Sequence, residues 1–211
     1  MNLGAAVTML KFRLGSRTDA DLDTLIPLEM DQAQFELERG GEPPWFLITE
    51  DFSLSTIAAD RRLPVPADFL LEVDEDCLWV ENAVGNRLAL EKGEFDASLA
   101  YWGMEQGFPA GYALVGQYFQ LFPIPDQVYT IWTKYYAADA APSSLLTTDT
   151  NLWLTWGQDL LLARTGRRMA TYLRDAELVQ VFAGEELAAT TRLKLETISR
   201  EETNRSRSKG D

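Results

Sequence analysis

The stretch FPIPDQVYTIWTKYYAAD, residues 122–139, is the part of the sequence that decides the fold. Its prolines indicate a turn, and the run after them is typical of a β-strand because β-branched and aromatic residues dominate it. Side chains alternate along a strand, so the run has two faces. One face carries Val128, Thr130, Trp132, Lys134 and Tyr136, and the other carries Tyr129, Ile131, Thr133 and Tyr135. Both faces are too apolar for water, and we expect this strand to be covered on both sides.

Further strand candidates precede this stretch and are separated by clusters of Gly, Pro, Asn and Asp. The strand candidates are residues 45–52, 68–73, 78–82, 87–92, 112–122 and 127–136. Between them, residues 94–103 predict one or two helical turns. This spacing favours an antiparallel sheet or small sandwich over βαβ units. We therefore expect a β-rich domain over residues 42–142.

Helical periodicity appears on both sides of that domain. Residues 3–14 predict a short helix, and Thr18 is a candidate N-cap for a second helix that Gly40 ends. The C-terminal part predicts two helices, residues 159–175 and 176–202, and then a flexible tail, residues 203–211. The predicted fold class is α+β. A helical bundle of the N-terminal helices (1–41) and C-terminal helices (143–202) packs with a small antiparallel β domain and carries a long C-terminal helix with an extended tail.

The last predicted helix is apolar on two sides. One stripe is Leu178, Val181 and Phe182, and the other is Leu187, Thr191, Leu195 and Ile198. A helix that is apolar on two sides must be buried on two sides, so one side would face its own chain and the other a neighbouring subunit. The alternative is a bend at Gly184 that brings both stripes to one core.

Composition narrows the possible functions. The chain of 211 residues has a net charge of −14, no histidine, and Cys77 as its one cysteine. An acidic surface disfavours wrapping by a nucleic-acid backbone, and without histidine the chain cannot supply Ser-His or Cys-His pairs or histidine metal ligands. We expect no signal peptide, no membrane span and no disulfide, and hence a protein made in a reducing cytoplasm.

An acidic cluster is the strongest candidate for chemistry. It comprises Glu72, Asp74, Glu75, Asp76 and Glu81. Carboxylates are ligands for Mg²⁺ or Ca²⁺, but the glycine and closing glutamate of an EF-hand loop are missing, and a solvated loop explains the cluster better. The prediction is therefore no metal, no cofactor and no catalytic residue.

Two basic regions are candidates for partner docking. Arg164, Arg167, Arg168 and Arg174 lie along one side of a predicted helix, where they could bind an acidic partner or pair with Glu177, Glu185 and Glu186 of the same chain. The C-terminal residues Arg200, Arg205, Ser206, Arg207 and Lys209 form a locally basic segment on an acidic chain. Such a segment either orders on a partner or only aids solubility.

An ordered series of segments resembles the head-to-tail adaptor (connector) proteins of tailed bacteriophages. The series is LPVPADF (63–69), YALVGQYFQLFPIPDQVYTIWTKYY (112–136) and SLLTTDTNLWLTWGQDLLLARTGRRMATYLRDAE (144–177). The resemblance covers most of the chain from Leu63 to Asp175. The sequence departs from it at Trp156-Gly157-Gln158, where many relatives begin the long C-terminal helix with a proline.

The resemblance implies a structural virion protein, not an enzyme. Such adaptors form a ring of about twelve copies on the portal protein, extend the DNA channel without specific DNA binding, and meet a tail or nozzle protein. It implies portal docking by the C-terminal residues, and the virion as the final location after assembly in the host cytoplasm. We also expect packing between neighbouring subunits, through Leu187, Leu195, Ile198, Trp132 and Tyr135.

Three alternatives stay open at this point. The first is a tail completion or stopper protein that contacts the tail and not the portal. The second is a carboxylate-dependent hydrolase that uses residues 72–81. The third is an intracellular ligand-binding domain with an apolar pocket between sheet and helices.

Overall fold

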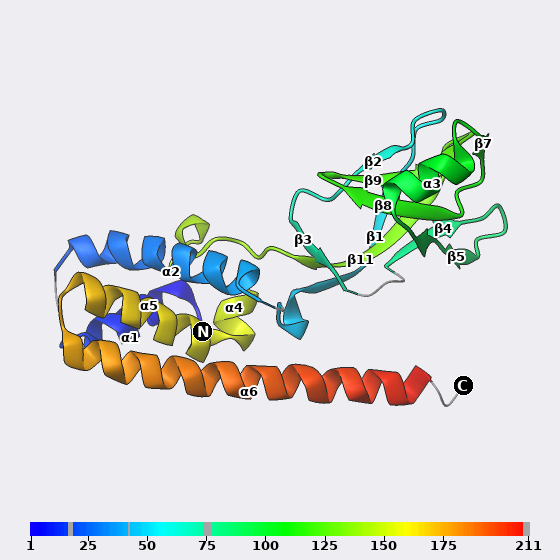
Figure 1. Cartoon of the computed structure of the whole chain (residues 1–211). Coiled ribbons are helices and arrows are strands. Elements are labelled where there is room, and N and C mark those ends of the chain that lie inside the picture. The colour runs from blue at the N-terminus through cyan, green and yellow to red at the C-terminus, as the bar shows by residue number, and fades with distance from the viewer. Residues whose placement is uncertain (17–18, 42, 74–76, 209–211) are drawn as a thin grey trace. The chain divides into compact units, whose positions relative to one another are not determined.

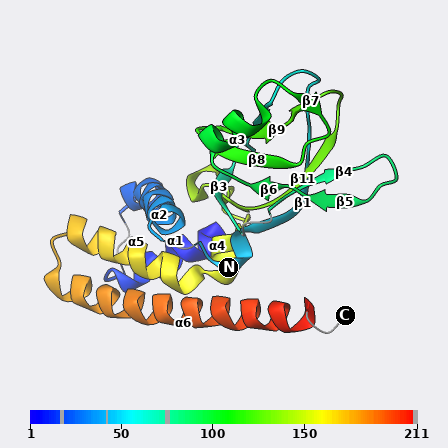
Figure 2. The ribbon, with the colours of Figure 1, turned by 45° about the vertical axis from the view of Figure 1, so that its right-hand side comes forward.

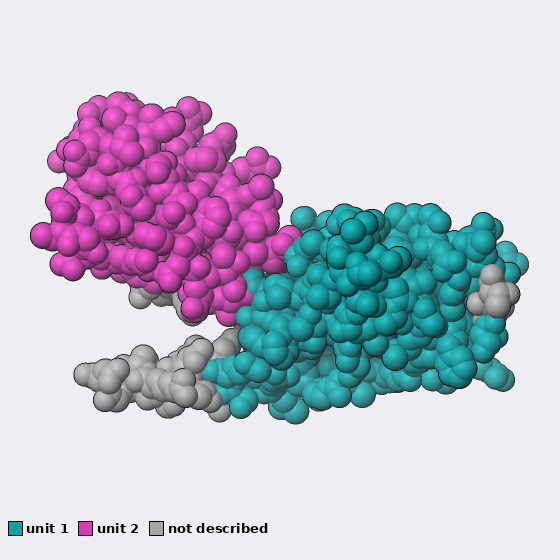
Figure 3. Space-filling view, turned by 180° about the vertical axis from the view of Figure 1, so that it is seen from behind, with its two compact units in different colours: residues 1–47, 139–211 teal, residues 48–138 magenta. Residues whose placement is uncertain are grey.

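The computed structural model describes residues 1–16, 19–41, 43–73 and 77–208, with residues 201–208 described by their backbone alone. The chain divides into two compact units, coloured teal and magenta in Figure 3. The helical unit comprises Met1–Leu47 and Asp139–Asp211, and the β unit comprises Ile48–Ala138. The β unit is thus an insertion between the N-terminal and C-terminal helices. The α+β fold class with a long C-terminal helix is confirmed (Figure 1).

The helical unit has five α-helices and two 3-10 turns among its described residues. They are α1 (Leu3–Arg13), α2 (Asp21–Arg39), η1 (Trp45–Leu47), η2 (Pro142–Ser144), α4 (Leu152–Trp156), α5 (Gln158–Tyr172) and α6 (Ala176–Ser208). The Asn2 side chain caps α1, and Gly40 follows α2 as expected. The predicted cap Thr18 lies outside the described residues. Helix α6 continues to Ser208, beyond the end expected at residue 202, because extending an existing helix avoids the cost of nucleation.

The bundle is built around the apolar stripe of α2. Leu22, Ile26, Met30 and Ala33 are buried at spacings of four, four and three residues. Figures 1 and 2 show α2 and α6 on opposite sides of the helical unit, with α1 and α5 between them. The helical unit therefore has a separate outward surface on each of these two sides.

Helices α5 and α6 approach each other at a glycine. A Cβ atom at Gly166 would lie 2.3 Å from Cε1 of Phe182, and the Phe182 side chain is only 1% exposed. No side chain larger than hydrogen fits at position 166 without moving that ring, because such a separation is far inside van der Waals contact. The Gly166–Phe182 contact therefore fixes which face of α6 is turned inward.

The β unit contains two main sheets. The strands are β1 (Ile48–Ser55), β2 (Arg62–Pro64), β3 (Phe69–Glu72), β4 (Leu78–Glu81), β5 (Arg87–Ala89), β6 (Glu91–Lys92), β7 (Gln106–Gly107), β8 (Gly111–Val115), β9 (Tyr118–Phe122), β10 (Ile124–Pro125) and β11 (Thr130–Ala137), with helix α3 (Phe95–Trp102) between β6 and β7. One sheet has the order β1-β11-β4-β5, with β3 also paired to β11, and the other has the order β2-β9-β8-β6. Most pairings are antiparallel as predicted, whereas β6 with β8 and β7 with β10 are parallel.

Three strand predictions need correction. The strand expected over residues 87–92 is two strands in different sheets, because β5 pairs with β4 whereas β6 pairs with β8. The strand expected over residues 45–52 begins only at Ile48, because the aromatic residues before it form η1 and pack in the helical unit. The run 112–122 is a hairpin of β8 and β9, in which Gly116 adopts a φ of 62° at the turn. A positive φ is readily accessible to glycine, which is why the turn falls there.

Strand β11, from the stretch that opens the sequence analysis, is central in its sheet. It pairs with β1 along one edge and with β3 and β4 along the other. Ile131, Thr133 and Tyr135 on one face are all 0% exposed. The core cluster of the β unit comprises Leu63, Cys77, Leu78, Val80, Leu90, Tyr112, Phe119, Leu121 and Ile131. The prediction that one face of this strand packs inside the β unit is confirmed.

A buried carboxylate holds the chain where it re-enters the helical unit. Glu38 Oε1 accepts hydrogen bonds from Gln34 Nε2 at 2.9 Å, from Trp153 Nε1 at 2.9 Å and from the backbone N–H of Asp139 at 3.2 Å. Desolvation by burial raises the pKa of Glu38 above its ordinary value of 4.5, and it outweighs those hydrogen bonds, which lower the pKa. The Asp139 carboxylate nearby raises the pKa further.

The close approach of α5 and α6 makes one glycine substitution costly and another favourable. We expect Gly166→Ala to lower the free energy of unfolding by about 1–3 kcal/mol, because the new methyl group displaces the Phe182 ring. Gly184→Ala is the matched control, since a Cβ there meets nothing within 4 Å and alanine is the better helix former, by about 0.5–1 kcal/mol. Thermal unfolding followed by circular dichroism measures both. Equal effects of the two substitutions would contradict the described packing.

Glu38 makes the stability of the helical unit depend on pH. Because the pKa of Glu38 is raised in the folded protein, the folded state binds the proton more tightly than the unfolded state does. The stabilising contribution of Glu38 to the free energy of unfolding is therefore greatest below its unfolded pKa and is lost as pH rises through its folded pKa. Glu38→Gln removes this titration and retains an acceptor for Trp153, so the variant gains stability relative to the native protein as pH rises. Glu38→Ala is the control, which loses about 1–3 kcal/mol through unpaired buried donors. Denaturant unfolding across pH gives the curves, and parallel curves for the native protein and Glu38→Gln would refute this account.

Candidate docking surfaces

Helix α6 exposes an apolar face to solvent. Leu187 is 70% exposed, Leu195 is 64% exposed and Ile198 is 51% exposed. The positions between them on this face are Gly184, Ala188 and Thr191, which are also exposed. The face therefore carries no charged residue from position 184 to position 198 along its centre. A contiguous apolar surface of this kind is typical of an interaction site.

The opposite face of α6 is buried in its own unit. Phe182, Glu186, Ala189 and Thr197 are buried, at the spacings of four, three and eight residues that place them on one side of a helix. The predicted stripe of Leu178, Val181 and Phe182 is only partly buried, because Val181 is 53% exposed. Helix α6 runs through Gly184 without interruption, so the two faces stay separate. The alternative of a bend at Gly184 that brings both stripes to one core is wrong.

Two charged residues along one edge of the exposed face are paired within the chain. Glu185 forms an ion pair with Arg13 of α1, and Arg192 forms one with Asp159 at the start of α5. These pairs keep that edge polar while the centre of the face remains apolar. An apolar centre with a polar rim is the usual anatomy of a protein interface.

The arginines of α5 do not form a free docking stripe. Arg164 contacts Glu186 at 2.6 Å, and Arg167 contacts the same carboxylate at 3.1 Å. Arg168 contacts two glutamates of α2, Glu29 at 2.7 Å and Glu36 at 2.6 Å. The structure thus shows intrachain pairing, the alternative to an acidic partner, for these three arginines. A docking role for them stays a prediction.

Arg174 differs from the other three arginines. It lies in the turn between α5 and α6 with a φ of 59°, and it is exposed. Within the described part of the chain it makes no ion pair. A docking role for Arg174 stays a prediction.

The two β11 residues predicted to pack against a neighbouring subunit have different surroundings. Tyr135 is fully buried, and its hydroxyl donates to Asp68 Oδ1 at 2.9 Å, so the prediction is wrong for Tyr135. Trp132 is half-buried, and its Nε1 donates to Glu81 Oε2 at 2.8 Å while the guanidinium of Arg87 lies 3.9 Å from its ring centroid. The outward face of β11 is thus largely covered by charged side chains of its own unit.

The predicted portal-binding residues lie at the end of α6. Arg200 is exposed, donates to Glu196 at 3.0 Å and lies over the Trp45 ring. Arg205, Ser206 and Arg207 are within α6, but their side chains are outside the described part, and Lys209 is outside the described residues. Their role in binding a portal stays a prediction.

The acidic cluster has protein partners where it is described. Glu72 forms an ion pair with Lys92 and accepts a hydrogen bond from the Tyr112 hydroxyl at 2.8 Å. Residues 74–76 lie outside the described residues. In the described ranges, no group of three His, Cys, Asp or Glu side chains is placed to hold a metal ion. No described helix combines the length and the apolar character that crossing a membrane requires.

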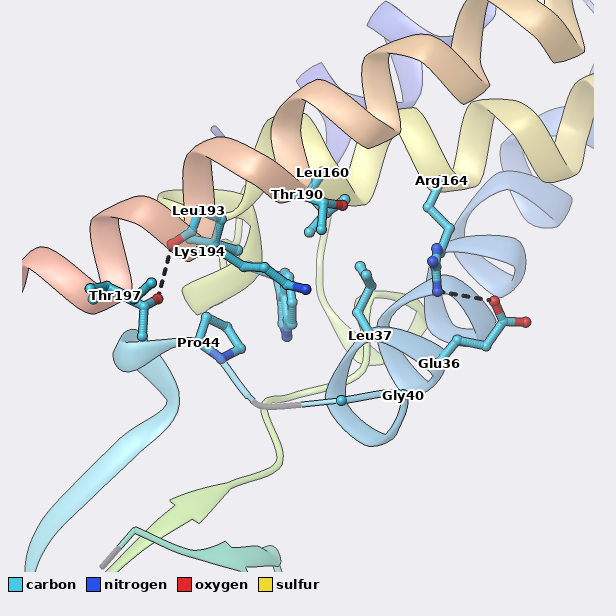
Figure 4. A pocket seen from close by; sticks show the side chains of 13 residues that line it. Glu36, Leu37, Gly40, Pro44, Leu160, Arg164, Thr190, Leu193, Lys194 and Thr197 are labelled. Atoms are coloured by element: carbon cyan, nitrogen blue, oxygen red, sulfur yellow. Dashed lines mark hydrogen bonds and ion pairs between the residues drawn. The ribbon is translucent and has the colours of Figure 1, made fainter. Parts of the chain in front are cut away.

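The helical unit contains a cavity of about 300 Å³. Figure 4 shows side chains that line it. It lies between the end of α2, α5 and α6, with Leu37, Pro44, Trp153, Leu160 and Leu193 as its apolar walls. Arg164 and Glu36 meet at one side of it, 3.5 Å apart. The alternative of a ligand-binding domain expected a pocket between sheet and helices, whereas this cavity lies among the helices. Ile198 lines the cavity and also lies on the exposed face of α6.

Comparison with known proteins identifies the family of this chain. A family model described as SU10 adaptor protein matches residues 1–209, which is nearly the entire chain. The search of curated proteins found no match. The matched span includes both units and the exposed face of α6, and the family consists of structural adaptor proteins of bacteriophages. The chain belongs to the SU10 adaptor protein family, as expected of a phage head-to-tail adaptor.

Proposed function

We propose that this protein docks as a ring on the portal protein, extends the DNA channel and links the capsid to the tail. Family membership supports a phage adaptor, and the exposed apolar face of α6 is the observation that carries the finer proposal. A monomer gains nothing from three large aliphatic side chains in water. Burial of this face against a second copy removes them from solvent.

Closure of a ring requires two different surfaces on each copy. A heterologous contact buries one surface of a subunit against a different surface of the next. The helical unit offers such a pair, because Leu28 on α2 is 49% exposed and Phe12 on α1 is 72% exposed. We propose that the outward face of α6 packs against the exposed side chains of α1 and α2 in the adjacent copy.

The charge of the chain suits a channel for DNA. A net charge of −14 repels the phosphate backbone at close range, so a genome passing through the ring does not adhere to it. The C-terminal residues from Arg200 to Lys209 are the local exception, and we propose that they bind the portal. Binding of an acidic portal surface by arginines is favoured by charge-assisted hydrogen bonds.

The first test concerns the exposed face of α6. Leu195→Glu places a charge on an exposed position, so we expect the stability of the isolated protein to change by less than about 0.5 kcal/mol. The same charge is costly in a buried contact between subunits, so assembly with portal particles should be lost. Leu195→Met is the matched control and should assemble as the native protein does. Native mass spectrometry and electron microscopy read the assembly, and normal rings of Leu195→Glu would reject the subunit contact.

The second test concerns the C-terminal segment. Deletion of residues 203–211 should leave thermal unfolding of both units unchanged, because it removes only the C-terminal end of α6 and the residues after it. Binding to portal particles should weaken by about tenfold or more, since several charge-assisted contacts are removed together. Co-sedimentation with portal particles measures this binding. Unchanged attachment would defeat the proposed role of the segment, and a ring found only at the tail would favour a stopper protein.

A further inference from the structure

The last residues before the β unit are held by an aromatic cluster of the helical unit. Trp45 and Phe46 form η1, directly before β1 begins at Ile48. The Trp45 ring meets the Trp156 ring edge-on at 5.4 Å, and the Phe46 ring meets the Trp153 ring at 5.1 Å and 90°. Both tryptophan partners belong to α4. Edge-to-face pairs of this kind fix the relative orientation of the rings.

The returning chain is held by the same short helix. The backbone N–H of Trp153 donates to Asp139 Oδ2 at 3.1 Å, and the indole N–H of Trp153 donates to Glu38. Asp139 is the first residue of the helical unit after the β unit. Helix α4 therefore anchors both crossings of the chain between the units, the outgoing one through Trp45 and Phe46 and the returning one through Asp139.

Arg200 adds α6 to this anchor. Its Cζ atom lies 3.5 Å from the centroid of the Trp45 ring, and its guanidinium also bonds Glu196 one turn earlier. A planar guanidinium stacked on an indole face is the most favourable form of cation–π contact. The Nε1 atom of Trp45 is buried and has no hydrogen-bond partner among the described residues, so the described contacts of this side chain are ring contacts. The contact with Arg200 thus ties the far part of α6 to the outgoing crossing.

We propose that the stacking of Arg200 on Trp45 is a latch that transmits occupancy of the C-terminal segment to the crossing between the two units. The terminal carbonyls of a helix lack partners, so the last turns open most readily. A partner bound beyond Arg200 holds these turns helical, which keeps Arg200 over Trp45 and η1 closed. The coupling rests on the proposed function, because it takes the portal as the ligand of the segment.

The coupling works in both directions. If a partner bound to the C-terminal segment favours the closed latch, then closing the latch raises the affinity for that partner by the same factor. Docking on the portal would then stiffen the connection to the β unit, the part of the chain left to meet the next component. An unbound copy would have the more mobile connection, so the latch distinguishes docked from undocked copies.

Hydrogen exchange of the isolated protein tests the latch without the portal. The Leu47 amide, which donates to Pro44 O at 3.0 Å, reports the opening of η1. We expect Arg200→Gln to speed exchange of this amide about two- to fivefold, the size expected for loss of an exposed cation–π contact. Arg192→Gln is the matched control, because Arg192 is on the same helix and pairs with Asp159 instead. An unchanged Leu47 rate in Arg200→Gln would overturn the latch.

Exchange in the presence of portal particles tests the coupling. Binding should slow the Leu47 amide in the native protein, and this slowing should be lost in Trp45→Leu, which lacks the indole face but retains every C-terminal residue. Slowing of the same size in both proteins would overturn the coupling. Failure of the native protein to bind portal particles would overturn the proposed function and the coupling with it, while the measurement on isolated protein would still decide the latch.

Discussion

The packing of α6 on α5 is the constraint on which the rest of the molecule depends. Gly166 admits the Phe182 ring to a distance that no other residue type would allow, and this contact sets the rotation of a helix of 33 residues. Once Phe182, Glu186 and Thr197 are turned inward, Leu187, Leu195 and Ile198 must face outward. A straight helix cannot bury both faces against a single small bundle, so its second face stays exposed in a single copy, and we propose that another copy covers it.

The packing of α6 on α5 also decides which surfaces of the helical unit stay exposed. The inward face of α6 and the glutamates of α2 take up the arginines of α5, so charge is satisfied inside the unit. The apolar surface left outside comprises the exposed face of α6 and single side chains such as Phe12 of α1 and Leu28 of α2. The ring that we propose needs two such surfaces on each copy, because a heterologous contact buries a different surface on each side of a subunit. The anchors at Trp153 and Trp45 then connect this assembly surface to the β unit through two short crossings.

Much of this could be predicted from the sequence where local pattern and burial agree. The buried face of β11, at Ile131, follows directly from the alternation of side chains along the predicted strand. Predictions failed where a tertiary partner decides the outcome. Whether Arg164 and Arg168 are free depends on Glu36, 128 residues from Arg164 in the chain, and periodicity carries no such information. Tyr135 is predicted to pack against a neighbouring subunit, yet it is buried in its own unit, where its hydroxyl donates to Asp68. The sequence predicts a strand that begins at Trp45, but Trp45 lies in a 3-10 turn, where its ring packs against Trp156.

The central claim is that the outward face of α6 is solvent-exposed in a free copy and covered by another copy in the particle. Hydroxyl-radical footprinting of Leu187, Leu195 and Ile198 on isolated protein and on intact virions tests it most directly, with buried Phe182 as the internal reference. The account predicts strong labelling of the three aliphatic residues in the free protein, marked protection of all three in virions, and low labelling of Phe182 in both. Equal labelling of these residues in the free protein and in virions would contradict it.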